Sequence, residues 1–334
     1  MSHHVRYALA AFYLSLFLFG YGAPVRAQIY EEAGKKHSWF SFSRPAKDNP
    51  TDQMIHAEAL LKERQLRRAE RAFRSLVLTW PSSPEAPMAQ WALARILDQR
   101  GKYEDAFDAY QKLMEKYPAR FPDHDRVLTR QFEIATQIMN KRRGGFFFGG
   151  FEAPERAIPF FEKIVRNAPR SPIAPEAQFL IGEAHEKNYE YELAVVAYSA
   201  VLHRYPLSDF AEPAAFARAR SLNTLSENYP NDRQAIEEAW AGIMVFLRSF
   251  PQSEFSDEAV TIRDRLLKRK AQATYEIARY YDRIAKRPQA AKVSYQQFLE
   301  QFPQSPWSDS ARERVAALAT TSSPDKELPD EQAE

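Results

Sequence analysis

The sequence predicts an all-α protein in which about six helix pairs stack in series as an α-solenoid. Glycine is scarce, at 10 of 334 residues, whereas the helix-favouring residues alanine, leucine, glutamate, arginine and glutamine are plentiful. An alanine, a bulky residue and a proline recur six times at fixed spacing. After residue 27, no segment approaches the roughly 18 apolar residues of a membrane-spanning helix.

Residues 1–27 predict a secretory signal peptide. Arg6 precedes an apolar run over residues 8–19, and small residues follow up to Ala27. The run is shorter than the ~20 residues that span a bilayer, and its flanks fit a leader that is cleaved before Gln28. The alternative is that the segment stays attached as an N-terminal anchor. We expect cleavage, export to the periplasm, and a mature chain without a transmembrane span.

Charge and cysteine content exclude several classes of function. Loss of residues 1–27 removes two arginines and no acid, so the 46 basic residues become 44 and equal the 44 acidic ones. Nucleic acid is therefore not an expected partner, because phosphate binding needs a concentrated basic surface. The sequence holds no cysteine, which excludes disulfides, zinc ribbons, thiol catalysis and a thioether-linked lipid in these 334 residues.

The repeated motif is Ala-x3-[Phe/Tyr/Ile]-x7-Pro. Its alanines are Ala69, Ala106, Ala157, Ala194, Ala239 and Ala291, and its bulky residues are Phe73, Tyr110, Phe161, Tyr198, Ile243 and Tyr295. Residues at i and i+4 share a helix face, so the alanine admits a neighbouring helix and the bulky side chain fills the space beside it. Proline cannot continue the helix and disfavours αR in the residue before it. The motif thus predicts six helices that each end at a proline.

Polar residues after each proline predict the start of another helix. Serine follows within two positions in five copies, and an acid and an alanine come next. Serine or aspartate can cap a helix, and acids suit its positive end. Each unit is therefore expected to run helix, short turn, helix and proline-marked turn.

The repeat resembles the tetratricopeptide (TPR) family over residues 53–318. In the better-kept units, Ala57, Ala94 and Gly182 supply the expected small residue on the first helix, twelve positions before the repeat alanine. The resemblance implies a right-handed superhelix with a groove lined by the first helices. In unit six Arg279 takes the small-residue position, so the first helices of units five and six are expected to be longer or packed differently.

Two insertions and two flanking segments complete the predicted organisation. Residues 140–154 are rich in glycine and phenylalanine, and residues 256–285 predict one long helix that leads into unit six. Residues 28–52 are expected to form a flexible linker. Residues 319–334 form an acidic tail without an apolar face, and we expect it to be disordered.

Motifs for catalysis are absent from the sequence. It contains no phosphate-binding loop, no Gly-x-Ser-x-Gly elbow and no His-Glu-x-x-His pair. His124-Asp125 and His185-Glu186 are adjacent pairs, but sequence neighbours on a helix point to different faces. We expect no enzyme activity, no cofactor and no metal site.

Four residues of the second unit are candidates for contacting a partner. In the TPR register, Met88, Trp91, Arg95 and Asp98 lie about one turn apart and face the groove, which suits an extended peptide or a helix. Trp91 also fits the alternative that aromatic residues at helical spacing serve packing.

Two further surfaces each allow two interpretations. Phe146, Phe147 and Phe148 lie between paired glycines and fit either an aromatic finger that docks on a partner or membrane, or rings folded back over the gap between units. The basic cluster over residues 263–270 fits a solvated helix face or a docking surface for an acidic partner.

A narrower resemblance concerns the second half of the chain. The Phe-Phe-Phe-Gly segment before Pro154-Glu-Arg-Ala, the segment Asp264-Arg265-Leu266, and Tyr275-x2-Ala278-x-Tyr280-Tyr281 are similar to the BamD-type subunit of the outer-membrane β-barrel assembly machinery. The family implies a periplasmic scaffold, peripheral to the outer membrane, that binds the periplasmic domains of the barrel-forming subunit. Asp264 and Arg265 then fall in the partner-contacting region, and the first two or three units receive unfolded outer-membrane protein peptides.

The sequence departs from that family in one respect, and competing functions stay open. Members usually carry a lipidated cysteine after the leader, where this chain has Gln28. The leading hypothesis is a non-enzymatic scaffold for outer-membrane protein assembly through protein–protein interaction. The alternative is a periplasmic TPR adaptor for cell-wall, polysaccharide-export or cell-division machinery. A third is an all-helical carbohydrate hydrolase, which would need two converging acids.

Overall fold

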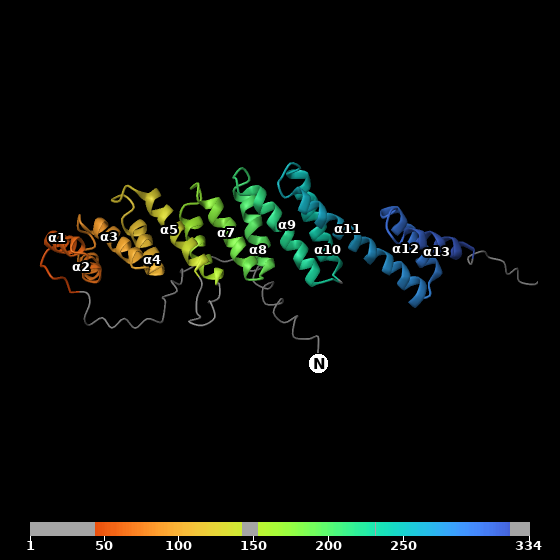
Figure 1. Ribbon diagram of the computed structural model, residues 1–334, viewed down its shortest axis with the longest axis horizontal. Helices are drawn as coiled ribbons and strands as arrows, with labels where there is room; N and C mark the ends of the chain where they lie inside the picture. Colours follow the sequence, from red (N-terminus) through yellow and green to blue (C-terminus); the bar gives the residue numbers. More distant parts are fainter. Residues whose placement is uncertain (1–43, 142–152, 231, 321–334) are drawn as a thin grey trace, which may run out of the picture. The chain divides into compact units, whose positions relative to one another are not determined.

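The computed structural model describes residues 44–141, 153–230 and 232–320. Within these ranges the regular structure is helical throughout, and they contain no strand (Figure 1). The helices are α1 (Pro50–Lys62), α2 (Leu66–Thr79), α3 (Ala86–Gln99), α4 (Tyr103–Lys116), α5 (His124–Asn140), η1 (Pro154–Ala157), α6 (Ile158–Asn167), α7 (Ala174–Lys187), α8 (Tyr191–Arg204), α9 (Ala211–Asn228), α10 (Arg233–Ser249), α11 (Ser256–Arg279), η2 (Tyr280–Ile284), α12 (Pro288–Gln301) and α13 (Ser308–Thr320). The all-α fold class is confirmed.

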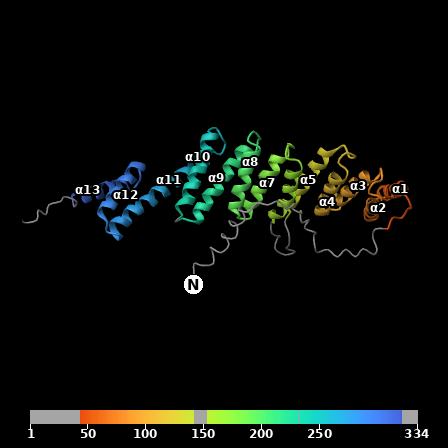
Figure 2. The ribbon, with the colours of Figure 1, turned by 180° about the vertical axis from the view of Figure 1, so that it is seen from behind.

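Helix packing follows chain order. Each helix packs against the one before it and the one after it, and both views show such neighbours side by side (Figures 1 and 2). The helices group into six pairs, from α1 with α2 to α11 with α12, and α13 covers the last pair. This series of local contacts is the pattern of a repeat protein, in which each unit buries its apolar face against its neighbours.

The repeat motif forms the centre of every unit. All six motif alanines are fully buried, and the six bulky partners each have at most 1% of their surface exposed. Gly182 shows how tight this packing is, because a Cβ atom there would lie 2.5 Å from the Tyr198 ring on the paired helix. The first-helix residues Ala57 and Ala94 are also fully buried. The small residues are therefore where one helix of a pair meets the ring of the other.

Proline ends the second helix of each unit as predicted. The residue before each motif proline is the C-cap, and in all six its backbone leaves the helical region, with φ between −135° and −127° and ψ between 40° and 64°. The proline ring disfavours αR at this position. The last helical residue therefore lies two positions before the proline in every unit.

The turn inside four of the units shares one backbone feature. Arg64, Gly101, Tyr189 and Lys286 occupy equivalent positions, five residues before the repeat alanine, and all have φ between 50° and 69°. This left-handed conformation is the usual way to end an α-helix sharply. Only Gly101 adopts it without a side-chain penalty.

Serine capping of the next helix is corrected by the structure. The N-cap residues of α3, α7, α9 and α11 form no side-chain capping bond. The serine lies earlier and builds the turn instead; for example, the Ser253 carbonyl oxygen accepts from the Ser256 N–H (3.1 Å), while its Oγ accepts from the Phe255 N–H (3.1 Å). Because the turn itself supplies an acceptor for the first helical N–H, a side-chain cap has no role there.

The first helices of the last two pairs are longer, as Arg279 suggested. The helix α9 has 18 residues and α11 has 24. Ile262 and Leu266 of α11 belong to the hydrophobic core shared with α9 and α10, whereas Ala271 and Ala278 belong to a separate core with α12 and α13. Residues 267–270 between them are charged or exposed. The helix α11 therefore joins two cores.

A π-helical turn, η2, ends α11 and is fixed by one buried acid. The Asp282 carboxylate, with 5% of its side chain exposed, accepts two bonds from Arg314 of α13 (2.9 and 2.7 Å) and one from the Tyr295 hydroxyl of α12 (3.3 Å). These bonds hold the pKa of Asp282 below its ordinary value, since the Arg314 guanidinium favours the carboxylate. Asp282 thereby ties the turn to both last helices.

Several predicted segments fall outside the described ranges. The predicted signal peptide, most of the linker, residues 142–152 of the first insertion and residues 321–334 of the tail are among them. In the ranges that the structure covers, no helix is long and apolar enough to cross a membrane.

Candidate binding groove

A cavity of about 910 Å³ opens along the first three units. Its walls come mostly from their first helices, α1, α3 and α5, and residues of α2 and α4 lie beneath. All four candidates on α3, Met88, Trp91, Arg95 and Asp98, line it. The helical register therefore positions them as the sequence predicted, on one face about a turn apart.

The four α3 residues differ in how free they are. Met88 is half exposed, whereas Trp91 has only 8% of its surface exposed. The Trp91 ring lies 5.4 Å from that of Tyr110 and 5.2 Å from that of Phe121, so its role is largely packing. Trp91 therefore contributes only a small part of its surface to the groove.

Asp98 already has a partner in the groove wall. Its two carboxylate oxygens accept from Nε and Nη2 of Arg130 on α5, at 2.6 and 2.7 Å. Arg130 also pairs with Glu133, and the bonds to Asp98 raise the pKa of the guanidinium further above neutrality. Burial, and then the Asp98 charge, raises the pKa of the nearby Tyr110 to about 12. Asp98 thus fixes α3 against α5 across the groove.

Free charge in the groove comes from other side chains. Arg95 is exposed and forms no ion pair or hydrogen bond with any residue that the structure describes. Arg126 of α5 lies over the Trp91 ring, 5.3 Å from its centroid, and Glu58 of α1 is exposed on the opposite wall. The groove therefore joins an apolar floor to separated cationic and anionic points, which suits an extended polypeptide better than a small polar molecule.

The sequence did not single out the contributions of α5. Arg126 and Arg130 stand four residues apart and so share one helix face. That spacing was visible, but many arginines in this chain share it, and only the packing of α5 beside α3 shows which pair enters the groove.

The second candidate surface lies on α11. Asp264 and Arg265 are both exposed. Asp264 lies on the side of α11 opposite the buried Ile262 and Leu266, whereas Arg265, three residues after Ile262, lies at the border of the buried face. Asp264 accepts from Arg263 (2.9 Å), and Arg265 lies 3.9 Å from Glu227 of α9. Both side chains are accessible to a partner at little cost, because these ion pairs are on the surface.

The basic cluster on α11 is partly internal. Arg269 donates to the hydroxyl and carbonyl oxygens of Ser226 on α9 (2.7 and 2.6 Å). Lys270 pairs with Glu237 (2.7 Å) and lies over the Trp240 ring. These two residues therefore hold α11 to its neighbours, which leaves Arg265 and Lys268 as the accessible cations of the cluster.

The two histidine pairs form local hydrogen bonds, and the remaining candidates lie outside the described residues. Phe146, Phe147 and Phe148 lie outside the described residues. The His124 ring bonds to the Pro118 carbonyl oxygen (2.7 Å), and His185 Nδ1 bonds to Glu190 (2.7 Å). Among the residues that the structure describes, no cluster of histidine, aspartate or glutamate is arranged to hold a metal ion.

Two family models match the chain. Residues 152–315 match the model described as outer membrane lipoprotein (YfiO), and residues 56–121 match a tetratricopeptide-repeat model. Neither family is catalytic, which agrees with the lack of catalytic motifs in the sequence.

Similar proteins include one curated relative and several solved structures. The outer membrane protein assembly factor BamD of Helicobacter pylori is 25% identical over 101 residues, which cover 30% of this chain; the chain spans 46% of that protein's length. The C-terminal part of a TPR repeat-containing protein from Cytophaga hutchinsonii is 18% identical over 80% of this chain and 88% of that one, with a TM-score of 0.32. YrrB, a TPR protein with an unusual peptide-binding site, is 14% identical; the match covers 64% of this chain and 92% of YrrB, with a TM-score of 0.31.

Proposed function

Since this chain is a tetratricopeptide-repeat protein with BamD-like features, we propose that it is a non-enzymatic periplasmic scaffold for the assembly and insertion of outer-membrane β-barrel proteins. The match of residues 152–315 to the outer membrane lipoprotein family supports this setting, as does the name of the Helicobacter pylori relative, an outer membrane protein assembly factor. The scaffold acts peripherally, at the periplasmic side of the outer membrane.

The observation that carries the proposal is the groove along α1, α3 and α5. Its apolar floor and its separated charges at Arg95 and Glu58 fit an unfolded peptide, whose side chains alternate in character. We assign to it the unfolded outer-membrane protein segments. The exposed pair Asp264 and Arg265 on α11 is assigned to the periplasmic domains of the barrel-forming subunit.

These two roles use separate parts of the array. The groove belongs to the first three pairs, whereas α11 opens the sixth. Since helices contact only near neighbours, one chain can hold a substrate segment and the barrel-forming subunit without competition between them. Scaffolding of this kind needs no reacting group.

Site-specific photo-crosslinking in intact envelopes tests both assignments. A crosslinking residue replaces Met88 in the groove or Arg265 on α11, and the neighbours are identified by mass spectrometry. We expect Met88 to capture unfolded barrel proteins and Arg265 to capture the barrel-forming subunit. Val293 on α12 is half exposed and lies in neither surface, so it is the matched control.

The alternative adaptor function gives a different result in the same experiment. Capture of peptidoglycan enzymes, polysaccharide exporters or division proteins at positions 88 and 265, with no barrel protein at either, would contradict the proposal. Equal capture of barrel proteins at the control position 293 would show that proximity alone explains the crosslinks.

A further inference from the structure

The exposed face of α2 carries a row of arginines. Arg67, Arg71, Arg74 and Leu78 follow one another at spacings of four, three and four residues, which places them on one side of the helix. The opposite side holds the buried motif residues of unit one. Leu78, which is 61% exposed, places an apolar side chain at the end of the cationic row.

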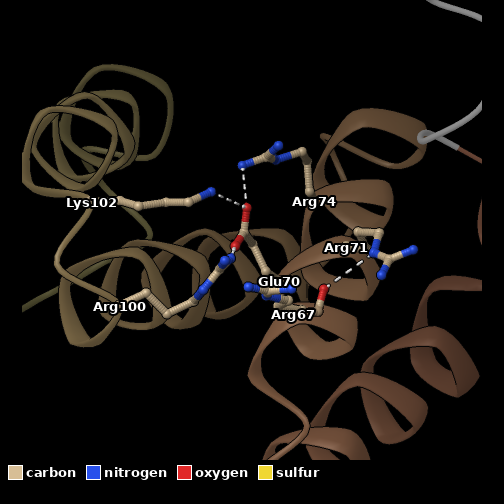
Figure 3. A network of polar contacts seen from close by, with 6 residues as sticks. All are labelled: Arg67, Glu70, Arg71, Arg74, Arg100 and Lys102. Carbon is tan, nitrogen blue, oxygen red and sulfur yellow. Dashed lines mark hydrogen bonds and ion pairs between the residues drawn. The ribbon is translucent and has the colours of Figure 1, made fainter.

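The loop that joins α3 to α4 adds two more cations, Arg100 and Lys102, to this face. Glu70 on α2 is buried and accepts from Arg74 (3.0 Å), from Lys102 (3.3 Å) and from Arg100 (Figure 3). Three cations thus converge on one carboxylate. This pairing holds Arg100 and Lys102 beside α2, although they lie 30 and 32 residues further along the chain.

Positive charge is in excess on this surface. The Arg71 Nε donates to the Arg67 carbonyl oxygen (3.3 Å), and neither guanidinium has an acidic partner among residues 44–141, 153–230 and 232–320 (Figure 3). Burial and the charges of Arg100, Arg74 and Arg67 lower the pKa of Lys102, against the opposing effect of Asp105. Five cations lie on this surface against the carboxylates of Glu70 and Asp105, so positive charge is in excess and the surface attracts anions.

We propose that this surface, the α2 basic face (Arg67, Arg71, Arg74, Lys102 and Leu78), binds the phosphate-bearing headgroups of an anionic lipid membrane. Guanidinium groups match phosphate oxygens in two-point contacts, and clusters of four or more cations on an amphipathic helix bind anionic lipid. Leu78 selects lipid over an acidic protein, because an apolar side chain in the same row can enter the headgroup region. The proposal is independent of the groove and of its ligand.

Vesicle flotation measures this binding directly. The chain is purified from envelopes in its natural processed form and mixed with vesicles of phosphatidylcholine, with or without phosphatidylglycerol. The readout is the partition coefficient on vesicles with phosphatidylglycerol divided by that on vesicles without it. Any contribution of an apolar anchor to membrane binding cancels in this ratio. We expect a ratio well above one at about 0.05 M salt that falls steeply at about 0.5 M, because salt screens exposed charges.

Two variants separate the charged and apolar parts of the face. R67Q/R71Q removes the two arginines that have no acidic partner, and at about a five-fold factor per cation it should lower the ratio roughly 30-fold. L78S should lower binding to anionic vesicles by a few-fold without changing its salt dependence. Neither touches the Glu70 pairing, and circular dichroism should show an unchanged thermal midpoint.

The matched control removes the same charge elsewhere. Arg170 and Arg248 are exposed and have no ion pair with any described residue, so R170Q/R248Q should leave the ratio within about two-fold of the wild type. An equal loss in both double variants would overturn the proposal in favour of diffuse charge attraction. A wild-type ratio of one, together with binding of labelled polyglutamate that R67Q/R71Q abolishes, would instead assign the face to an acidic protein.

Discussion

At the scale of single residues, stability depends on how closely small and large side chains meet. The six motif alanines are fully buried, and at Gly182 a ring from the paired helix occupies the space that a larger side chain would need. Close-packed interiors resist even one added methyl group where the neighbour cannot move. The consequences are measurable at positions where a single carbon atom changes the contact.

Gly182 provides the sharpest test of this packing. In G182A the new Cβ atom would lie 2.5 Å from the buried Tyr198 ring, whose position is fixed further by the bond that the Tyr198 hydroxyl donates to Glu186 (2.8 Å). We expect a loss of about 1–3 kcal/mol in the free energy of unfolding, measured by urea denaturation, despite the better helix propensity of alanine. G242A is the control, because its nearest atom is the flexible end of Leu222 (2.8 Å), and it should be close to neutral. Equal effects would contradict the packing argument.

Asp282 gives a prediction that depends on pH. D282N removes the carboxylate that accepts from Arg314 and Tyr295, and should lower the free energy of unfolding by about 2 kcal/mol at pH 7. The folded-state pKa of Asp282 lies below its ordinary value of 3.8. Its contribution is therefore complete above about pH 4 and is lost as the pH falls through the lower folded-state value, so wild type and D282N should converge in acid.

A surface acid separates this effect from general charge. Asp309 pairs with Arg312, but its side chain is almost fully exposed. D309N should change the free energy of unfolding by less than about 0.5 kcal/mol at either pH. A pH-dependent loss in D309N as large as that in D282N would show that net charge, rather than the buried pairing, is responsible.

At the scale of helices and turns, the sequence was most informative where interactions are local. The alanine–ring spacing and the pre-proline residue act within one helix, so the six motif helices and their ends were predictable. The serines after the prolines were misjudged as caps, because several backbone conformations satisfy the same first N–H. The π-helical turn was not predictable, since Asp282, which lies in that turn, is held by Arg314, 32 residues further along the chain.

The groove shows the same division between local and distant information. Helical register alone placed Met88, Trp91, Arg95 and Asp98 on one face of α3. Which of these side chains is free to contact a ligand depends on a different helix, because Arg130 of α5 already forms an ion pair with Asp98. The α2 basic face was missed for a similar reason, as Lys102 joins α2 only in three dimensions.

The turn between α7 and α8 allows a prediction at this scale. Tyr189 has φ near 62° and is largely exposed, so its side chain contributes little while its backbone is held in the left-handed region. Y189V should lower the free energy of unfolding by about 1–2 kcal/mol, because a β-branched residue tolerates this conformation poorly. Y189G should be neutral or slightly stabilising. L193V, at an exposed position of α8, is the control and should lower the free energy of unfolding by about 0.5 kcal/mol or less. A loss there as large as in Y189V would show that the effect comes from introducing valine and not from the left-handed backbone.

At the scale of the described array, the chain of local contacts makes stability regional. The largest core runs from Ala57 to Ala197, whereas a separate core between Ala271 and Leu318 holds the last helices. The two are linked through intermediate cores and through α11, whose residues 267–270 belong to none of these hydrophobic cores. Such arrays unfold unit by unit more readily than compact domains do.

Hydrogen exchange measured by mass spectrometry can locate this behaviour. F298A removes a fully buried ring from the C-terminal core, at a cost of about 3–5 kcal/mol. We expect faster exchange in α12, α13 and the second half of α11, with no change in α3 and α4. F73A, which empties the first core, should show the reverse pattern. Faster exchange along the entire array in either variant would mean that the array unfolds as a single cooperative unit.

The restriction of helix contacts to chain neighbours has a consequence for how such a protein changes during evolution. Because the described helices pack against near neighbours in the chain, duplication or loss of one helix pair between α5 and α11 would leave the remaining interfaces intact. The interval between the groove and the α11 surface is thus counted in whole units. A lineage can lengthen or shorten that interval by recombination without redesigning either end.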